Sequence, residues 1–187
     1  MSANKWSSRV ILAVIGLCFG FEAVAQTRWE KELEEAVPLF GHRNWIVVAD
    51  SAYPAQISSG VKTIATGVKQ IEVVEAVLGA VEKAPHVRGT VFLDTELPHV
   101  PEQHAPGIAE YRSNLKQVLE KRKTISLPHE EIIAQLDEAG KTFHVLVLKT
   151  DLTLPYTSVF VRLDCGYWSD EAEAALRKAM ANQKKAK

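Results

Sequence analysis

Five side chains of this sequence could carry chemistry: two histidines, an aspartate, a tyrosine and a serine. They are His42, Asp50, His129, Tyr156 and Ser158. Histidine titrates near neutral pH and can accept or donate a proton, whereas carboxylates and hydroxyls form hydrogen bonds with the hydroxyl groups of a ligand. The set is therefore better suited to proton transfer and hydroxyl recognition than to nucleophilic or redox chemistry.

His42 and Asp50 flank an apolar run at residues 45–49. A strand of five residues is about 17 Å long, so the two side chains need not touch directly, although a loop could bring them to one rim. Asp50 follows the strand, and ligand sites in α/β sheets prefer the carboxyl ends of strands. The alternative, which the spacing alone favours, is that His42 is a turn residue bonded to a backbone carbonyl and that Asp50 caps a loop.

The other three candidates lie near element boundaries. His129 follows a proline at the start of an expected helix, and Glu130 and Glu131 after it suit the positive end of the helix dipole. Tyr156 and Ser158 stand at the mouth of a strand after Pro155. Their alternative role is a β-turn that leads into an edge strand, and the role of His129 is left open by the spacing.

A metal site is a weaker possibility. His99 and His104 in HVPEQH are five residues apart, without a carboxylate pattern on a helix that would complete a zinc site. The sequence has no GxGxxG after a strand, no GxxxxGK[ST] and no GxSxG elbow, and we expect no metal and no cofactor. A formal net charge of −1 argues against a nucleic-acid binder.

The N-terminus differs in composition from the rest of the chain. Lys5 and Arg9 precede an apolar run at residues 10–21, and Ala23-Val24-Ala25 follows as a small-x-small site. This pattern predicts a signal peptide at residues 1–25, cleaved after Ala25, and a periplasmic or secreted protein. The alternative is a membrane anchor, but a run of 12 residues is shorter than the roughly 18–20 needed to span a bilayer.

Hydrophobic periodicity predicts one α/β domain at residues 26–187, with a mainly parallel sheet flanked by helices. After removal of the signal peptide, Cys165 is the single cysteine, so no internal disulfide can form. The expected helices are 28–37, 70–83, 107–122, 129–139 and 170–180, and the expected strands are 45–49, 90–93, 142–148 and 158–163. Residues 51–60 and 98–106 are expected to be irregular, and a basic tail ends the chain.

Several motifs occur in an order known from one family. The chain has Gly41-His42, an apolar strand and Asp50-Ser51-Ala52-Tyr53-Pro54, then QIEVVEAVLGAVEKAP, Pro128-His129-Glu130-Glu131-Ile132 and Pro155-Tyr156-Thr157-Ser158. Over roughly residues 33–166 this resembles the D-ribose pyranase and L-fucose mutarotase family. Its members carry Gly-His, an apolar strand, Asp-Ala-x-x-Pro, a Thr-His-Glu-x-Phe helix start in the ribose branch and a Tyr-x-Asn turn.

The resemblance implies a sugar mutarotase that needs no metal or cofactor, acts on a free monosaccharide and forms homo-oligomeric rings with sites between neighbouring subunits. By family role, His42 would be the catalytic proton donor or acceptor. Asp50 and His129 would hold sugar hydroxyls, and Tyr156 with Ser158 would close the pocket.

The sequence also departs from the family pattern. The usual Gly-His-Gly-Asp or Gly-His-Thr-Asp reads Gly41-His42-Arg43-Asn44, so that an amide replaces a carboxylate. Ser158 stands where the turn has asparagine. These changes favour an alternative, a non-catalytic sugar-binding or assembly protein of the same fold.

Overall fold

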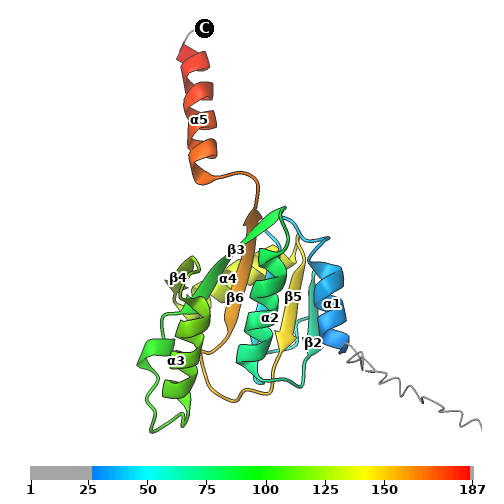
Figure 1. Ribbon diagram of the computed structural model, residues 1–187, viewed down its shortest axis with the longest axis vertical. Helices are drawn as coiled ribbons and strands as arrows, with labels where there is room; N and C mark the ends of the chain where they lie inside the picture. Colours follow the sequence, from blue (N-terminus) through cyan, green and yellow to red (C-terminus); the bar gives the residue numbers. More distant parts are fainter. Residues whose placement is uncertain (1–26, 186–187) are drawn as a thin grey trace, which may run out of the picture.

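A six-stranded sheet with the order β2-β5-β1-β6-β3-β4 forms the centre of the molecule. The computed structural model describes residues 27–185, with side chains through residue 182, so the expected signal peptide at 1–25 lies outside the described residues (Figure 1). The strands are β1 (Trp45–Ala49), β2 (Val61–Ala65), β3 (Val87–Asp94), β4 (Thr124–Leu127), β5 (Val145–Lys149) and β6 (Val159–Cys165).

Only one strand of this sheet runs against the others. β1 and β2 each pair in parallel with β5, and β3 pairs in parallel with β4, whereas β6 is antiparallel to both β1 and β3. The mainly parallel sheet expected from the sequence is thereby confirmed. One consequence matters for the site: the amino end of β6 lies at the same edge as the carboxyl ends of the other five strands.

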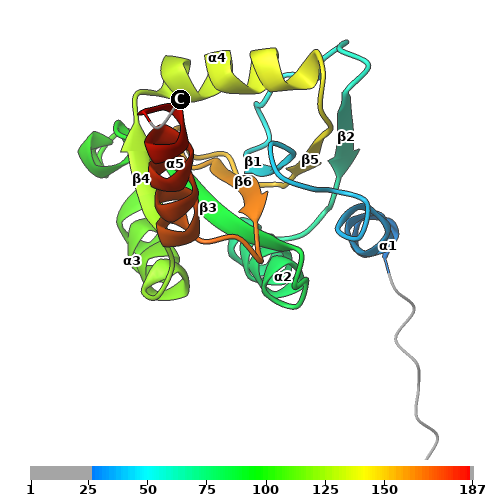
Figure 2. The same ribbon diagram turned by 90° about the horizontal axis from the view of Figure 1, so that it is seen from above.

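Helices cover both faces of the sheet. Helices α1, α2 and α3 pack on one face and α4 on the other, as the view from above shows (Figure 2). The helices are α1 (Arg28–Ala36), α2 (Gln70–Glu82), α3 (Ile108–Leu119), α4 (His129–Gly140) and α5 (Asp170–Lys185), and a short 3-10 turn η1 spans Leu97–His99. Within residues 27–185, no helix is both long and apolar enough to cross a membrane.

The run at β1 is apolar throughout because both faces of this strand are covered. Ile46 and Val48 belong to the cluster beneath α1, α2 and α3, whereas Trp45 and Val47 belong to the cluster beneath α4. All five residues of β1 are buried. A strand covered on two sides needs apolar residues at successive positions rather than alternation, which explains the pattern in the sequence.

Two short strands and the 3-10 turn were not expected from the sequence. β2 and β4 are the edge strands of the sheet and have partly exposed, mixed polar and apolar residues, so their hydrophobic pattern is weak. The 3-10 turn falls within the segment expected to be irregular. The helix expected at 170–180 is present as α5 and continues to Lys185.

Candidate functional site

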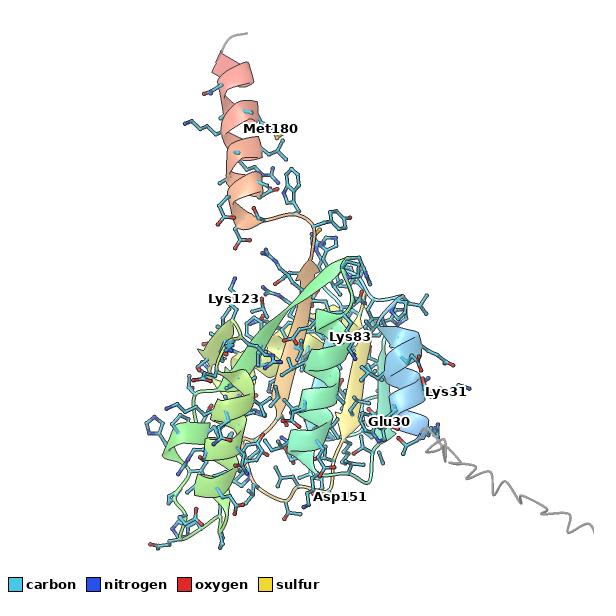
Figure 3. All side chains as sticks on the ribbon, in the orientation of Figure 1. Glu30, Lys31, Lys83, Lys123, Asp151 and Met180 are labelled. Carbon is cyan, nitrogen blue, oxygen red and sulfur yellow. The ribbon has the colours of Figure 1, made fainter. Side chains whose placement is uncertain are left out.

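Four chain segments meet at the sheet edge where β1 and β3 end. Asp50 follows β1, Asp94 is the last residue of β3, and His129 begins α4 directly after β4. Ser158 precedes β6, whose reversed direction brings its amino end to this edge. Asp151, labelled in Figure 3, follows β5 and marks the same edge.

Asp50 and Ser158 form one half of the site. The Ser158 hydroxyl donates to Oδ2 of Asp50 at 3.1 Å, and Oδ1 of Asp50 accepts the backbone N–H of Ala52 at 2.9 Å. Asp50 thus caps its loop, as the simpler interpretation expected, and also holds Ser158. The expected alternative of an edge strand after Ser158 is wrong, because β6 lies between β1 and β3 within the sheet.

His129 and Asp94 form the other half. Nδ1 of the His129 ring lies 3.0 Å from Oδ2 of Asp94, whose side chain is fully buried. Burial raises the pKa of Asp94 above its ordinary value, and the neighbouring His129 opposes this rise. The second oxygen, Oδ1, has no hydrogen-bond partner among the described residues. A buried carboxylate with a histidine at this distance can fix both the tautomer and the orientation of the ring.

Glu96 fixes the start of the helix that carries His129. Its two carboxylate oxygens accept the backbone N–H of His129 at 3.1 and 3.2 Å. A carboxylate at a helix N-terminus satisfies a backbone donor and complements the helix dipole. The imidazole is therefore positioned through its ring by Asp94 and through its backbone by Glu96.

Tyr156 lies beside the His129 ring. The two rings are 5.7 Å apart and meet edge to face at an interplanar angle of 84°. Tyr156 is 41% exposed and has a φ of 57°, a left-handed conformation that is uncommon for a large side chain. Backbone strain of this kind is often found at functional sites, where the surrounding structure maintains it.

A buried polar network holds the loop that carries Tyr156 and Ser158. The hydroxyl of Tyr111 donates to the carbonyl of Thr157 at 2.6 Å, and Nε2 of Gln70 also donates to that carbonyl. The Thr150 hydroxyl contacts Oε1 of Gln70 at 2.9 Å and the carbonyl of Ala49 at 3.0 Å. Because Thr157 lies between Tyr156 and Ser158, this network fixes the backbone of both site residues.

A hollow of about 640 Å³ opens beside Tyr156. Its lining residues are Thr95, Glu96, His99, Val100, Pro101, His104, Pro128, Pro155 and Tyr156. His99 and His104 thus border the site, but no group of three metal-ligating side chains occurs in the described part of the chain. A hollow with aromatic and polar walls next to a positioned histidine is large enough to admit a monosaccharide.

His42 does not join the other four candidates within one chain. It lies in the turn before β1, and the N–H of the next residue, Arg43, donates to the carbonyl of Leu163 near the end of β6. The five-residue β1, about 17 Å long, therefore separates exposed His42 from Asp50. The structure brings together Asp50, His129, Tyr156 and Ser158 but places His42 at the opposite edge of the sheet.

The amide of Asn44 has a local role in this turn. Its Oδ1 accepts the N–H of Gly41 at 2.8 Å, and its Nδ2 donates to the carbonyl of His144 at 3.2 Å. A carboxylate could accept the first hydrogen bond but could not donate the second. Asn44 thereby ties the His42 turn to the segment that precedes β5.

Sequence reasoning missed Asp94 and Glu96. The signal was present, because Asp94 follows an apolar strand segment just as Asp50 does. What the sequence lacked was the order of the strands, which places β3 two positions from β1 with β6 between them.

Comparison with solved structures identifies the fold. The fucose mutarotase from Streptococcus pneumoniae in complex with L-fucose matches with a TM-score of 0.50 at 19% identity, over 71% of this chain and 91% of that chain. FucU from Bifidobacterium longum matches with a TM-score of 0.50 at 20% identity, over 72% and 94%. No protein-family model matches the sequence, and no curated protein matches it. The chain therefore has the fold of these two proteins, as the resemblance of the sequence motifs predicted.

Proposed function

We propose that this protein binds a free monosaccharide and interconverts its ring or anomeric forms. The observation that carries the proposal is the convergence of Asp50, Asp94, His129, Tyr156 and Ser158 at one sheet edge, where Tyr156 also lines a hollow. The structurally similar fucose mutarotase was solved with L-fucose. Its name and ligand support a sugar as the substrate class.

Ring opening of an aldose requires removal of a proton from the anomeric hydroxyl and delivery of a proton to the ring oxygen. Closure on the other face of the aldehyde, or on another hydroxyl, then gives the isomer. With Asp94 ionised and accepting the Nδ1 proton, Nε2 of His129 is a hydrogen-bond acceptor for a sugar hydroxyl. Asp50 can accept a second sugar hydroxyl, and the Tyr156 ring can cover one face of the sugar.

We assign the second proton-transfer group to His42 of a neighbouring subunit. His42 is exposed at the edge opposite the other candidates, so it could reach such a site only across an interface between copies. The family resemblance likewise implies rings with shared sites. In this scheme His129 and His42 act on opposite sides of the sugar, and no cofactor is required.

Exchange NMR at the anomeric resonances tests the activity. We expect the protein to accelerate exchange between anomers or ring forms of at least one sugar in a panel of ribose, fucose, galactose and related aldoses. His129→Ala should abolish the acceleration, while Asp151→Asn, which changes an exposed acid at the same edge, should leave it unchanged. Exchange at the buffer rate across the whole panel would rule out the proposed activity.

The second candidate function is sugar binding without turnover. Two observations favour it. The Ser158 hydroxyl already donates its hydrogen bond to Asp50, and Asn44 stands where the family has a carboxylate. Calorimetry distinguishes the two functions, because binding heat without accelerated exchange would establish the binder. Absence of binding for every sugar tested would exclude both.

A further inference from the structure

Helix α5 leaves an apolar stripe uncovered. Ala172, Leu176 and Met180 follow one another at intervals of four residues and so share one face of the helix. Leu176 is 42% exposed and Met180 is 46% exposed. The charged residues Arg177 and Lys178 lie on other faces. A helix with an apolar stripe and a charged remainder is built to pack against a partner surface.

The chain's own domain does not cover this stripe. None of the described side chains of α5 is buried, and the helix points away from the sheet (Figures 1 and 2). Its start is held on the β3 side, where Asp170 pairs with Arg88 at 2.7 Å and lies 4.0 Å from Lys123. Figure 2 shows α1 on the far side of the molecule from α5.

A groove between α1 and α2 has the features that such a helix needs. Its volume is about 940 Å³, and its floor and walls include Trp29, Leu33, Val37, Ala76, Gly79 and Ala80. Small residues on α2 allow the backbone of another helix to approach closely. Trp29 is buried, and its indole N–H has no acceptor among the described residues.

The charges along the groove are complementary to those along α5. Glu30 lines the groove near the start of α1, Glu75 lines it near the middle of α2, and Lys83 lines it at the end of α2. Figure 3 shows Glu30 and Lys83 at different heights along this face. Helix α5 begins with Asp170, Glu171 and Glu173, and Arg177, whose Nε pairs with Glu173 at 2.6 Å, follows in the middle of the helix beside the apolar stripe. If the acidic start of α5 lies beside Lys83, Arg177 lies farther along the groove, toward Glu30 and Glu75.

We propose that α5 docks into the α1/α2 groove of a second copy of this chain. Helix α5 leaves the domain at the carboxyl end of β6. If two copies face each other at this end of the sheet, each can place its α5 in the groove of the other. The result is a closed, two-fold symmetric dimer. In this arrangement α5 enters the groove from the end marked by Lys83, as the charges require. The interface lies at the sheet edge that also carries His42, opposite the edge where Asp50, His129, Tyr156 and Ser158 meet, and its test does not depend on the proposed function.

Disulfide trapping between two differently tagged chains tests the exchange. In a background with Cys18 and Cys165 replaced by serine, one chain carries Ala80→Cys in the groove and the other carries Leu176→Cys on the apolar stripe. After mixing and mild oxidation, we expect a disulfide-linked heterodimer. The matched control replaces Leu176→Cys with Lys178→Cys, which lies on another face of α5 and should form several-fold less of the linked species.

Sedimentation of the full chain provides a second measurement. Leu176→Asp should weaken self-association by about tenfold or more, because it places a charged group in the apolar contact. Lys178→Asp should weaken it less. The proposal is overturned if no link forms between chains, if Lys178→Cys links as efficiently as Leu176→Cys, or if Leu176→Asp leaves association unchanged.

Discussion

At the residue scale, Asp94 and His129 form the carboxylate–imidazole pair of the site. Asp94 is fully buried and contacts the ring of His129 with one oxygen, so its main effect is to orient the imidazole. Asp50 has a different environment, because it accepts hydrogen bonds from Ser158 and from the backbone of Ala52. One carboxylate therefore positions the histidine, and we propose that the other holds a ligand hydroxyl.

Replacement of Asp94 by asparagine should impair catalysis more than binding. An amide at this position can no longer act as an anion that accepts the Nδ1 proton, so the tautomer of His129 is no longer fixed. We expect kcat for anomer exchange to fall by roughly 100-fold, the lower end of what positioned acid–base catalysis contributes. Sugar affinity measured by calorimetry should change little. A parallel loss of affinity would mean that Asp94 holds the ligand.

The same variant has a predictable effect on stability. Because burial raises the pKa of Asp94 above its ordinary value of 3.8, the folded state binds this proton more tightly than the unfolded state does. Stability contributed by Asp94 is thus greatest at low pH and decreases as pH rises above about 3.8 to the folded pKa. Urea titrations of both proteins should show Asp94→Asn gaining stability relative to the natural chain over this window. If Asp94→Asn instead lost stability relative to the natural chain as pH rises, the conclusion that burial raises the pKa of Asp94 would be contradicted.

Tyr156 combines backbone strain with a ring at the site. Asparagine tolerates a left-handed backbone better than tyrosine does. Tyr156→Asn should therefore raise the free energy of unfolding by up to about 1 kcal/mol while weakening sugar binding, since the ring beside His129 is lost. Tyr167→Asn is the control, because Tyr167 is an exposed tyrosine without a positive φ. Unchanged sugar affinity would remove Tyr156 from the proposed pocket.

At the scale of the elements, a network of buried side chains ties α2 and α3 to the loop before β6. Gln70 at the start of α2 and Tyr111 on α3 both donate to the carbonyl of Thr157. Burial raises the pKa of Tyr111, and the hydrogen bond from Gln70 only partly opposes this rise, so this phenol remains a donor throughout the neutral range. The helices on one face of the sheet thereby fix the backbone of the site residues on the loop.

Removal of Gln70 should loosen that loop. Gln70→Ala leaves Thr150 without its side-chain partner and deprives the Thr157 carbonyl of one donor, which should cost about 1–3 kcal/mol. Urea unfolding measures the loss, and the exposed Gln117→Ala on α3 is the matched control. Sugar affinity should fall with the stability of the loop. Equal stabilities for the two variants would show that the network does not hold the loop.

At the scale of the whole molecule, the proposed position of His42 makes a prediction about subunit mixing. If each site takes His42 from one copy and His129 from another, then His42→Ala and His129→Ala chains are each inactive alone. Mixed rings of the two should recover part of the activity, because some interfaces then combine both natural histidines. Exchange NMR on refolded mixtures measures the recovery, and complete inactivity of the mixture would place His42 outside the site.

The signal peptide that the sequence predicts at residues 1–25 makes a separate prediction about the mature chain. Export by a cell that recognises the signal should release a protein that begins at Gln26, as intact mass analysis would show. Ala25→Arg should block cleavage, because the site requires a small residue. A mature protein that retains residues 1–25 would instead support the membrane anchor.

The sequence by itself predicted the α/β class, five helices and the four central strands, because buried strands and amphipathic helices have strong hydrophobic periods. The edge strands β2 and β4 were not predicted, because their partial exposure weakens the hydrophobic pattern. The motifs also identified Asp50, His129, Tyr156 and Ser158 as candidates. Only the tertiary structure could unite them with Asp94 and separate them from His42, because the strand order and the single reversed strand β6 decide which strand ends meet. Those pairings join residues as far apart in the chain as Asp50 and Ser158, and no local spacing specifies them.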